Sequence, residues 1–190
     1  VDIQGLVMEL NLFEDIFSNS LSGNIFMIDT DNLILNLPII GQETLSLKIK
    51  TPNFDGKRTS FGFTGAGGTQ RFEVYKVGLS TDLSHGSNIY ELKFTSPETL
   101  RNIRTRVSKS YTQSISDIVE DLLMNENYIG TTKELEIEPT LGVRRYVCPN
   151  NHPYTVIKSF LAESISGITQ SPHYFCLLYT SDAADDLLCV

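Results

Sequence analysis

The chain has 190 residues, of which 41% are hydrophobic and 20% are charged, and its formal net charge is −8. This length and composition suffice for one good hydrophobic core, or for one and a half domains. The mild acidity argues against a nucleic-acid-binding protein, which usually carries a basic excess, and no apolar run approaches the roughly 18 residues of a membrane span.

The first part of the chain is predicted to be rich in β-strands. Residues 8–12 alternate between apolar and polar side chains, which indicates a half-buried strand, and the Ser/Asn-rich residues 18–20 mark a turn after it. The unbroken apolar run at 25–28 predicts a strand that is buried on both faces. Residues 32–40 are apolar but are interrupted by a proline, so a short helix or a loop is expected there.

Further strands are predicted before the middle of the chain. Residues 45–49 alternate strictly and indicate a half-buried strand, whereas the Gly/Ser/Thr-rich stretch 53–70 is typical of a surface loop. Two more strands, at 72–79 and 89–95, are predicted to form a hairpin across residues 84–87.

The stretch Tyr90–Leu123 is the most informative part of the chain, because it predicts a strand and two helices in succession. Pro97 suits the first turn of a helix, with Thr95 or Ser96 as N-cap. That helix is predicted to carry Leu100, Ile103 and Val107 at helical spacing, surrounded by four basic residues: Arg101, Arg104, Arg106 and Lys109.

The second helix of this stretch follows a Ser-rich break. Ser114 is its predicted N-cap, and Asp117 stands where a capping box places an acidic residue. The apolar residues recur at helical spacing and predict one buried face: Ile115, Ile118, Val119, Leu122 and Leu123.

Two strands and a helix are predicted after position 130. Residues 134–138 alternate, so a strand would place three carboxylates, Glu134, Glu136 and Glu138, on one face. A further strand is expected at 143–148. Asn151 or His152, with Pro153, opens a third helix whose inward residues are predicted to be Val156, Ile157, Phe160 and Leu161.

The residues that could carry chemistry do not form a convincing site. Cys148 and His152 have one plausible metal-ligand spacing, but zinc usually needs three or four ligands, and His85 and His173 are the only other imidazoles. A buried thiol that behaves as a small apolar residue is the preferred interpretation. No G-x-S-x-G nucleophile elbow is present. No catalytic residue, cofactor or metal is therefore predicted.

The basic residues of the first helix are the most prominent exposed feature of the sequence. One interpretation is a solvated helix face with ordinary surface ion pairs. The functional hypothesis is a subunit interface, in which Arg101, Arg104, Arg106 and Lys109 meet the acidic strand Glu134, Glu136 and Glu138 of another copy. Complementary charge of this kind sets register and partner choice.

The last residues of the chain differ in origin from the rest. Residues 176–190, CLLYTSDAADDLLCV, back-translate into the reverse complement of a common transposase-type sequencing adapter, and we expect them to be an artefact. Leaving out their three aspartates raises the formal charge from −8 to −5, and leaves Cys148 as the only cysteine. We therefore expect residues 1–175 to be a piece of a longer protein, and we expect no disulfide framework within this segment.

The Tyr90–Leu123 stretch resembles baseplate hub proteins of contractile-tailed bacteriophages and the related type VI secretion spike proteins. Those proteins share a Y-x-L strand that runs into a Pro-initiated helix with a Leu-x-x-x-R core, and a Ser-x-x-D-I-[IV]-x-x-[IVL]-L helix that follows it. The matching residues here are Tyr90, Leu92, Pro97, Leu100, Arg104, Ser114, Asp117, Ile118, Val119, Leu122 and Leu123. The run ELNLFEDIFSNSLSGNIFMID near the start is also similar to the opening of phage hub proteins.

The resemblance implies an α+β protein. Its β part would be an antiparallel barrel or split-sandwich tube domain, with an inserted two-helix unit and a third helix. Within residues 1–175 the β-rich part would span 1–95, the helical insertion 96–128, and further strands plus a helix 134–166.

The resemblance further implies a non-enzymatic structural protein of the virion tail baseplate, assembled in the host cytoplasm. Hub proteins form homotrimeric rings that join the tail tube protein to the central spike protein. Three alternatives stay open: a portion of a longer tail-associated cell-wall hydrolase, a type VI or tailocin spike protein, and an enzyme unrelated to tails.

Overall fold

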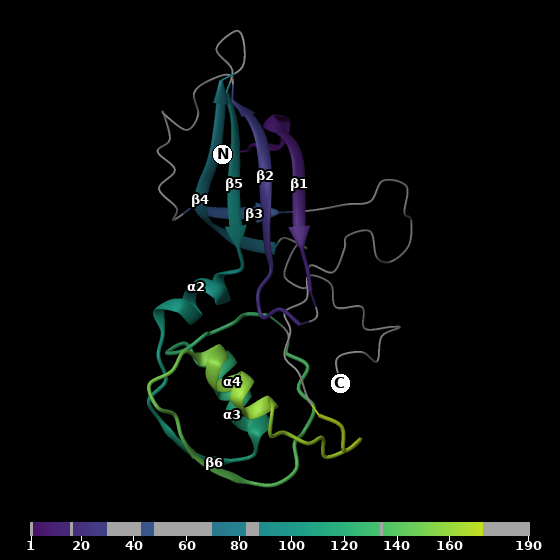
Figure 1. The fold of residues 1–190 in the computed structure, drawn as a ribbon, viewed down its shortest axis with the longest axis vertical. Helices are drawn as coiled ribbons and strands as arrows, with labels where there is room; N and C mark the ends of the chain where they lie inside the picture. Colours follow the sequence, from purple (N-terminus) through teal and green to yellow (C-terminus); the bar gives the residue numbers. More distant parts are fainter. Residues whose placement is uncertain are drawn as a thin grey trace.

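The computed structural model describes residues 2–15, 17–29, 43–47, 70–82, 88–133 and 135–172 of the chain. An antiparallel sheet occupies one end of the molecule and a helical unit the other (Figure 1). The protein is therefore an α+β protein, as the order of the predicted elements indicated. A short 3-10 helix, η1 (Gln4–Leu6), precedes the first strand.

The sheet has five strands in the order β1-β2-β5-β4-β3, and all neighbours are antiparallel. They are β1 (Val7–Phe13), β2 (Ser22–Asp29), β3 (Thr44–Leu47), β4 (Gln70–Asp82) and β5 (Asn88–Thr95). The register between β4 and β5 shifts twice, and such bulges bend a strand. Because β4 bends, β3 crosses the direction of β1 and β2, and the sheet curls into a half-barrel (Figure 1).

One face of this sheet carries the apolar core of the β unit. Ile25 and Met27 of β2 are buried there, and the rings of Phe72 and Phe94 pack edge to face with their centroids 5.0 Å apart. The prediction that residues 25–28 are buried on both faces is wrong, because burial alternates along β2 and Phe26 and Ile28 are only half-buried. Alternation is typical of an antiparallel strand with one packed face.

The sheet passes into the helical unit at the end of β5. Ser96, one of the two candidates, is the N-cap residue of α2 (Pro97–Arg104). The carbonyl oxygen of Leu21, just before β2, accepts two hydrogen bonds: one from Ser96 N at 2.9 Å and one from Thr95 Oγ1 at 3.0 Å. The start of α2 is thereby tied to β2 by hydrogen bonds, in addition to its covalent link to β5.

Helix α2 is shorter than predicted. It ends at Arg104, and Val107 lies in an isolated β-bridge with Asn151, where its nitrogen donates to the Asn151 carbonyl at 2.8 Å. Val107 is fully buried by this pairing rather than by a helical face, and Ile103, predicted to face inward, is 62% exposed. Arg106 and Lys109 therefore lie outside the helix.

The helical unit contains α3 (Ile115–Met124), α4 (Pro153–Leu161) and a two-stranded ribbon. The ribbon pairs β6 (Ser110–Gln113) with β7 (Arg144–Val147). Strand β6 replaces the break expected between the helices, whereas β7 was predicted. The N-cap of α3 is confirmed, since Ser114 Oγ accepts from Asp117 N at 3.2 Å.

The cores of both helices follow the predicted spacing. All five apolar residues predicted to face inward from α3 are buried. Val156, Ile157 and Phe160 of α4 pack inward with Tyr154, while Leu161 is half-buried. Tyr146 of β7 covers this core by packing edge to face on Phe160 at 4.7 Å.

The acidic strand predicted at 134–138 is wrong for the residues that the structure describes there, because 135–138 carry no strand pairing. The expected strand at 45–49 is confirmed up to Leu47, and the 72–79/89–95 hairpin is confirmed as β4 and β5. The short helix or loop expected at 32–40, the hairpin turn at 84–87 and the tail 176–190 lie outside the described residues. So does the loop expected at 53–70, except for Gln70, which is the first residue of β4 rather than part of a loop.

Candidate subunit interface

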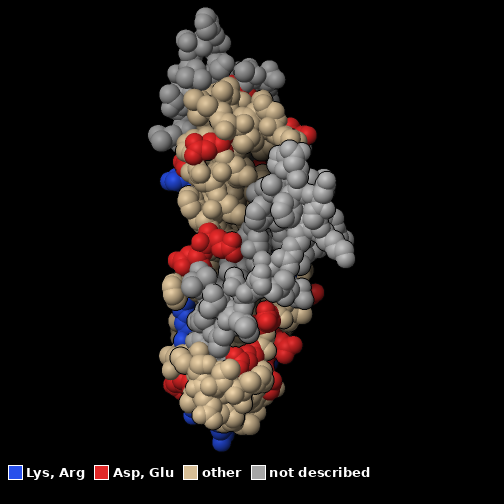
Figure 2. Space-filling view, turned by 90° about the vertical axis from the view of Figure 1, so that its right-hand side faces the viewer, with Lys and Arg blue, Asp and Glu red and all other residues tan. Residues whose placement is uncertain are grey.

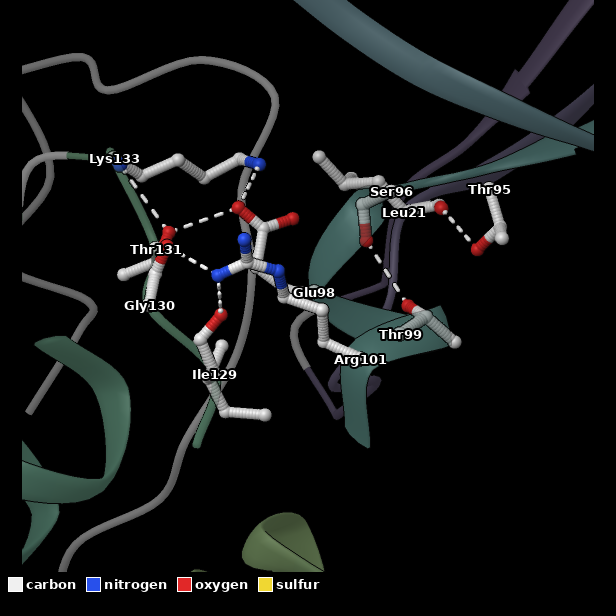
Figure 3. Close-up of polar contacts among 10 residues, drawn as sticks. All are labelled: Leu21, Thr95, Ser96, Glu98, Thr99, Arg101, Ile129, Gly130, Thr131 and Lys133. Atoms are coloured by element: carbon white, nitrogen blue, oxygen red, sulfur yellow. Dashed lines mark hydrogen bonds and ion pairs between the residues drawn. The ribbon is translucent and has the colours of Figure 1, made fainter. Parts of the chain in front are cut away.

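Arg101, the first of the predicted interface cations, is directed into its own chain. Its Nη1 donates to the carbonyl oxygens of Ile129 at 2.8 Å and Gly130 at 3.2 Å (Figure 3). Gly130 has a φ of +54°, a conformation that side-chain-bearing residues seldom adopt, and an added Cβ would overlap this guanidinium. Arg101 thus fixes the turn that follows α3.

Glu98 extends from the same helix to the same segment. Its Oε1 accepts from Thr131 Oγ1 at 2.8 Å and from Lys133 Nζ at 2.7 Å, and the residue is buried (Figure 3). Burial opposes ionisation of this carboxyl, but the charge and hydrogen bond of Lys133 outweigh it and hold the pKa of Glu98 below its ordinary value. The arrangement is a buried ion pair that joins α2 to residues 129–133.

Lys109 and Arg106 also have partners within the chain. Lys109 Nζ lies 2.9 Å from Asp121 Oδ2 and 4.7 Å from the centre of the Tyr111 ring, and Tyr111 OH donates to the same carboxylate oxygen at 2.7 Å. The hydrogen bond with Asp121 raises the pKa of Lys109. Arg106 Nη1 donates to the Asn150 carbonyl at 3.1 Å.

Asp121 is the common acceptor of this second cluster. Burial opposes its ionisation, but the hydrogen bonds from Lys109, Tyr111 and Asn125 outweigh burial and lower the pKa of Asp121. Burial, followed by the bond to Asp121, raises the pKa of Tyr111. The cluster ties β6 to α3.

Arg104 and the acidic residues complete the predicted interface set. Arg104 is exposed, and its guanidinium has no polar partner among the residues that the structure describes. Glu136 is exposed, Glu138 accepts a hydrogen bond from Ser166 Oγ, and Glu134 lies outside the described residues. Within one chain the structure brings none of the described glutamates into an ion pair with the four cations.

Cys148 lies in the core, and His152 ties the start of α4 to the end of α2. Cys148 is a buried free thiol, and burial raises its pKa. His152 Nδ1 lies 2.9 Å from the carbonyl oxygens of both Asn102 and Thr105, so this nitrogen carries the proton and donates to the end of α2. Over the described ranges, no group of three His, Cys, Asp or Glu side chains could hold a metal ion, and no helix there is long and apolar enough to cross a membrane.

Two features of this end of the molecule were missed by sequence reasoning. One is that Asn102 of α2 caps α4 from outside that helix, by accepting a hydrogen bond from Tyr154 N. The other is the adjacent pair Arg144 and Arg145, which places two exposed cations on β7. The Arg pair is visible in the sequence, but its exposure depends on β7 having β6 as its single strand neighbour among the described residues. Figure 2 shows lysine and arginine along one side of the lower part and at its tip, and acidic groups over both parts.

No family model matches the chain, and no curated protein matches it. Among solved structures it is similar to the c3393 protein of E. coli, with 15% sequence identity and a TM-score of 0.49. That protein is described as a component of the type VI secretion system with structural similarity to the T4 bacteriophage tail proteins gp27 and gp5. The match covers 83% of this chain and 42% of c3393, so the chain is similar to less than half of that secretion-system protein.

Proposed function

We propose that the chain is a structural subunit of the baseplate hub of a contractile tail, in which three copies form a ring between the tail tube and the central spike. Residues 1–175 would belong to the tube-forming part of the hub. A type VI or tailocin spike protein would use the same part in the same way. No chemical reaction is assigned to the segment.

The observation that carries this proposal is the structural role of the hub-like sequence block. Tyr90 and Leu92 are buried in β5, Pro97 begins α2, and Leu122 and Leu123 are buried in α3. The block therefore forms the joint between the curled sheet and the helical unit. The resemblance over these residues is therefore a resemblance in how the two parts are connected.

The open sheet also supports a ring. Its outer strands β1 and β3 each have one strand neighbour among the described residues. Unpaired strand edges favour association, and closure of identical subunits into a ring removes such edges. A half-barrel that neighbours complete is suited to a tube wall.

Size-exclusion chromatography with light scattering, followed by negative-stain microscopy of the same fraction, tests the proposal. We expect the mass of three chains and class averages with threefold symmetry and a central opening. A monomer at high protein concentration, or a closed twofold dimer, would contradict the ring.

A further inference from the structure

Residues Leu135–Ile137 have unpaired backbone groups. Leu135 and Ile137 are half-buried and Glu136 is exposed, which is the alternation of a strand. Within the described part of the chain, however, no N–H or C=O group of these three residues is hydrogen-bonded. An edge of this kind is a ready template for a strand from another molecule.

Strand β7 offers the matching edge. Cys148 N donates to the Lys109 carbonyl at 2.9 Å, in register with the ladder of β6 and β7. Successive residues of an antiparallel strand turn their backbone groups to opposite sides. The backbone N–H and C=O groups of Tyr146 and Arg144 therefore point to β6, whereas those of Arg145 and Val147 point away from it. No described residue pairs with these outward backbone groups.

The side chains along this outer edge are exposed. Val143 and Val147 are 70% and 68% exposed, and Arg145 between them is exposed as well. The guanidinium of Arg145 has no ion pair or hydrogen bond within the described ranges. The β6–β7 ribbon lies at the end of the molecule away from the sheet, where a second chain can reach it (Figure 1).

The charges of the two edges are complementary. Glu136 is the free carboxylate of residues 135–137, while Arg145 occupies the middle of the outer edge of β7. Pairing the two edges would set Glu136 opposite Arg145, and opposite charges across a strand pair stabilise it.

We propose that residues 135–137 of one copy add as a strand to the outer edge of β7 of a second copy, with Glu136 paired to Arg145. The contact joins two different surfaces, so repetition around a rotation axis closes a ring. The inference rests on the proposed function for the presence of the second copy, but it places the contact at Arg145 rather than at the basic residues near α2.

Charge exchange tests the pairing by size-exclusion chromatography with light scattering. We expect Arg145→Glu and Glu136→Arg each to shift the parent oligomer toward monomer, and the double variant to restore it. The matched control is Arg104→Glu, which makes the same change at an exposed arginine outside this contact, and it should leave the mass unchanged. Circular dichroism melting confirms that each variant is folded.

Disulfide trapping provides a second readout. In a background with Cys176→Ser and Cys189→Ser, we expect Glu136→Cys with Arg145→Cys to give covalent oligomers on oxidation, and Glu136→Cys with Arg104→Cys to give none. A parent oligomer that resists both charge variants and yields no cross-link would overturn the pairing while leaving the hub proposal standing. A monomeric parent would overturn both.

Discussion

Asn102 of α2 caps α4: its Oδ1 accepts a hydrogen bond from the backbone nitrogen of Tyr154 at 2.8 Å, across 52 positions of sequence. His152, the residue before Pro153, donates in return to the Asn102 and Thr105 carbonyls. The end of one helix and the beginning of another thus satisfy each other's unpaired backbone groups.

Replacing this cap should weaken the helical unit. We expect Asn102→Ala to lower the free energy of unfolding by about 1 kcal/mol, because a Tyr154 N–H at the start of α4 loses its acceptor. Asn102→Asp keeps an acceptor oxygen and should retain most of the stability. Urea denaturation of the three proteins measures the difference, and equal stability of the alanine and parent proteins would refute the capping role.

Removing Lys133 should be costly, because it leaves Glu98 buried without its charge partner. We expect Lys133→Met to lower the free energy of unfolding by about 3 kcal/mol, as for other broken buried pairs. Adding Glu98→Gln should recover part of that loss, since the amide oxygen can still accept from Thr131 and no charge stays buried. Lys76→Met, at an exposed lysine of β4, is the control and should be near neutral.

Acid should destabilise the fold through Glu98 and Asp121. Both carboxyls have pKa values held below their ordinary values of 4.5 and 3.8 in the folded protein. Their contribution to stability is therefore fully present above those ordinary values and is lost as pH falls through the lower folded values. Urea denaturation at pH values from about 6 to about 2 measures this effect. The free energy of unfolding should fall more steeply with acid for the parent than for Glu98→Gln/Lys133→Met.

A methyl group at Gly23 should be poorly tolerated. A Cβ there would overlap the backbone oxygen of Asn11 and the ring of buried Phe94. Since neither can move freely, we expect Gly23→Ala to cost about 2 kcal/mol or more, in the range of overpacked cores. Gly5→Ala has nothing within 4 Å of its added Cβ and should change stability by less than about 0.5 kcal/mol. Thermal melting of the two variants compares them directly.

The elements that could be predicted from sequence are those specified by near neighbours. The α3 face and its Ser114 cap depend on spacing within one helix, and both were confirmed. Val107 was misassigned because its burial comes from pairing with Asn151, which local periodicity cannot reveal. The alternation at 134–138 specifies an extended, two-faced segment but says nothing of whether the same chain supplies a partner strand.

The predicted interface residues likewise combine properties that can be read from the sequence with contacts that only the fold creates. Charge and exposure can be inferred for Arg101, Arg106 and Lys109, but their acceptors at Ile129, Asn150 and Asp121 are brought near only by the folded chain. The sequence therefore identified a basic region without its internal partners. Arg104 and Arg145 keep free guanidinium groups within the described residues, and they separate the two interface hypotheses experimentally.

The double hydrogen bond on the Leu21 carbonyl has a mechanical consequence. It ties the beginning of α2 to β2, and β2 and β5 run along the long axis of the molecule (Figure 1). A force along that axis therefore reaches β5 through the covalent chain and β2 through the Leu21 carbonyl, while the ladder hydrogen bonds hold the two strands together along their length. A pull on the helical unit is thereby shared by the whole length of the central strand pair.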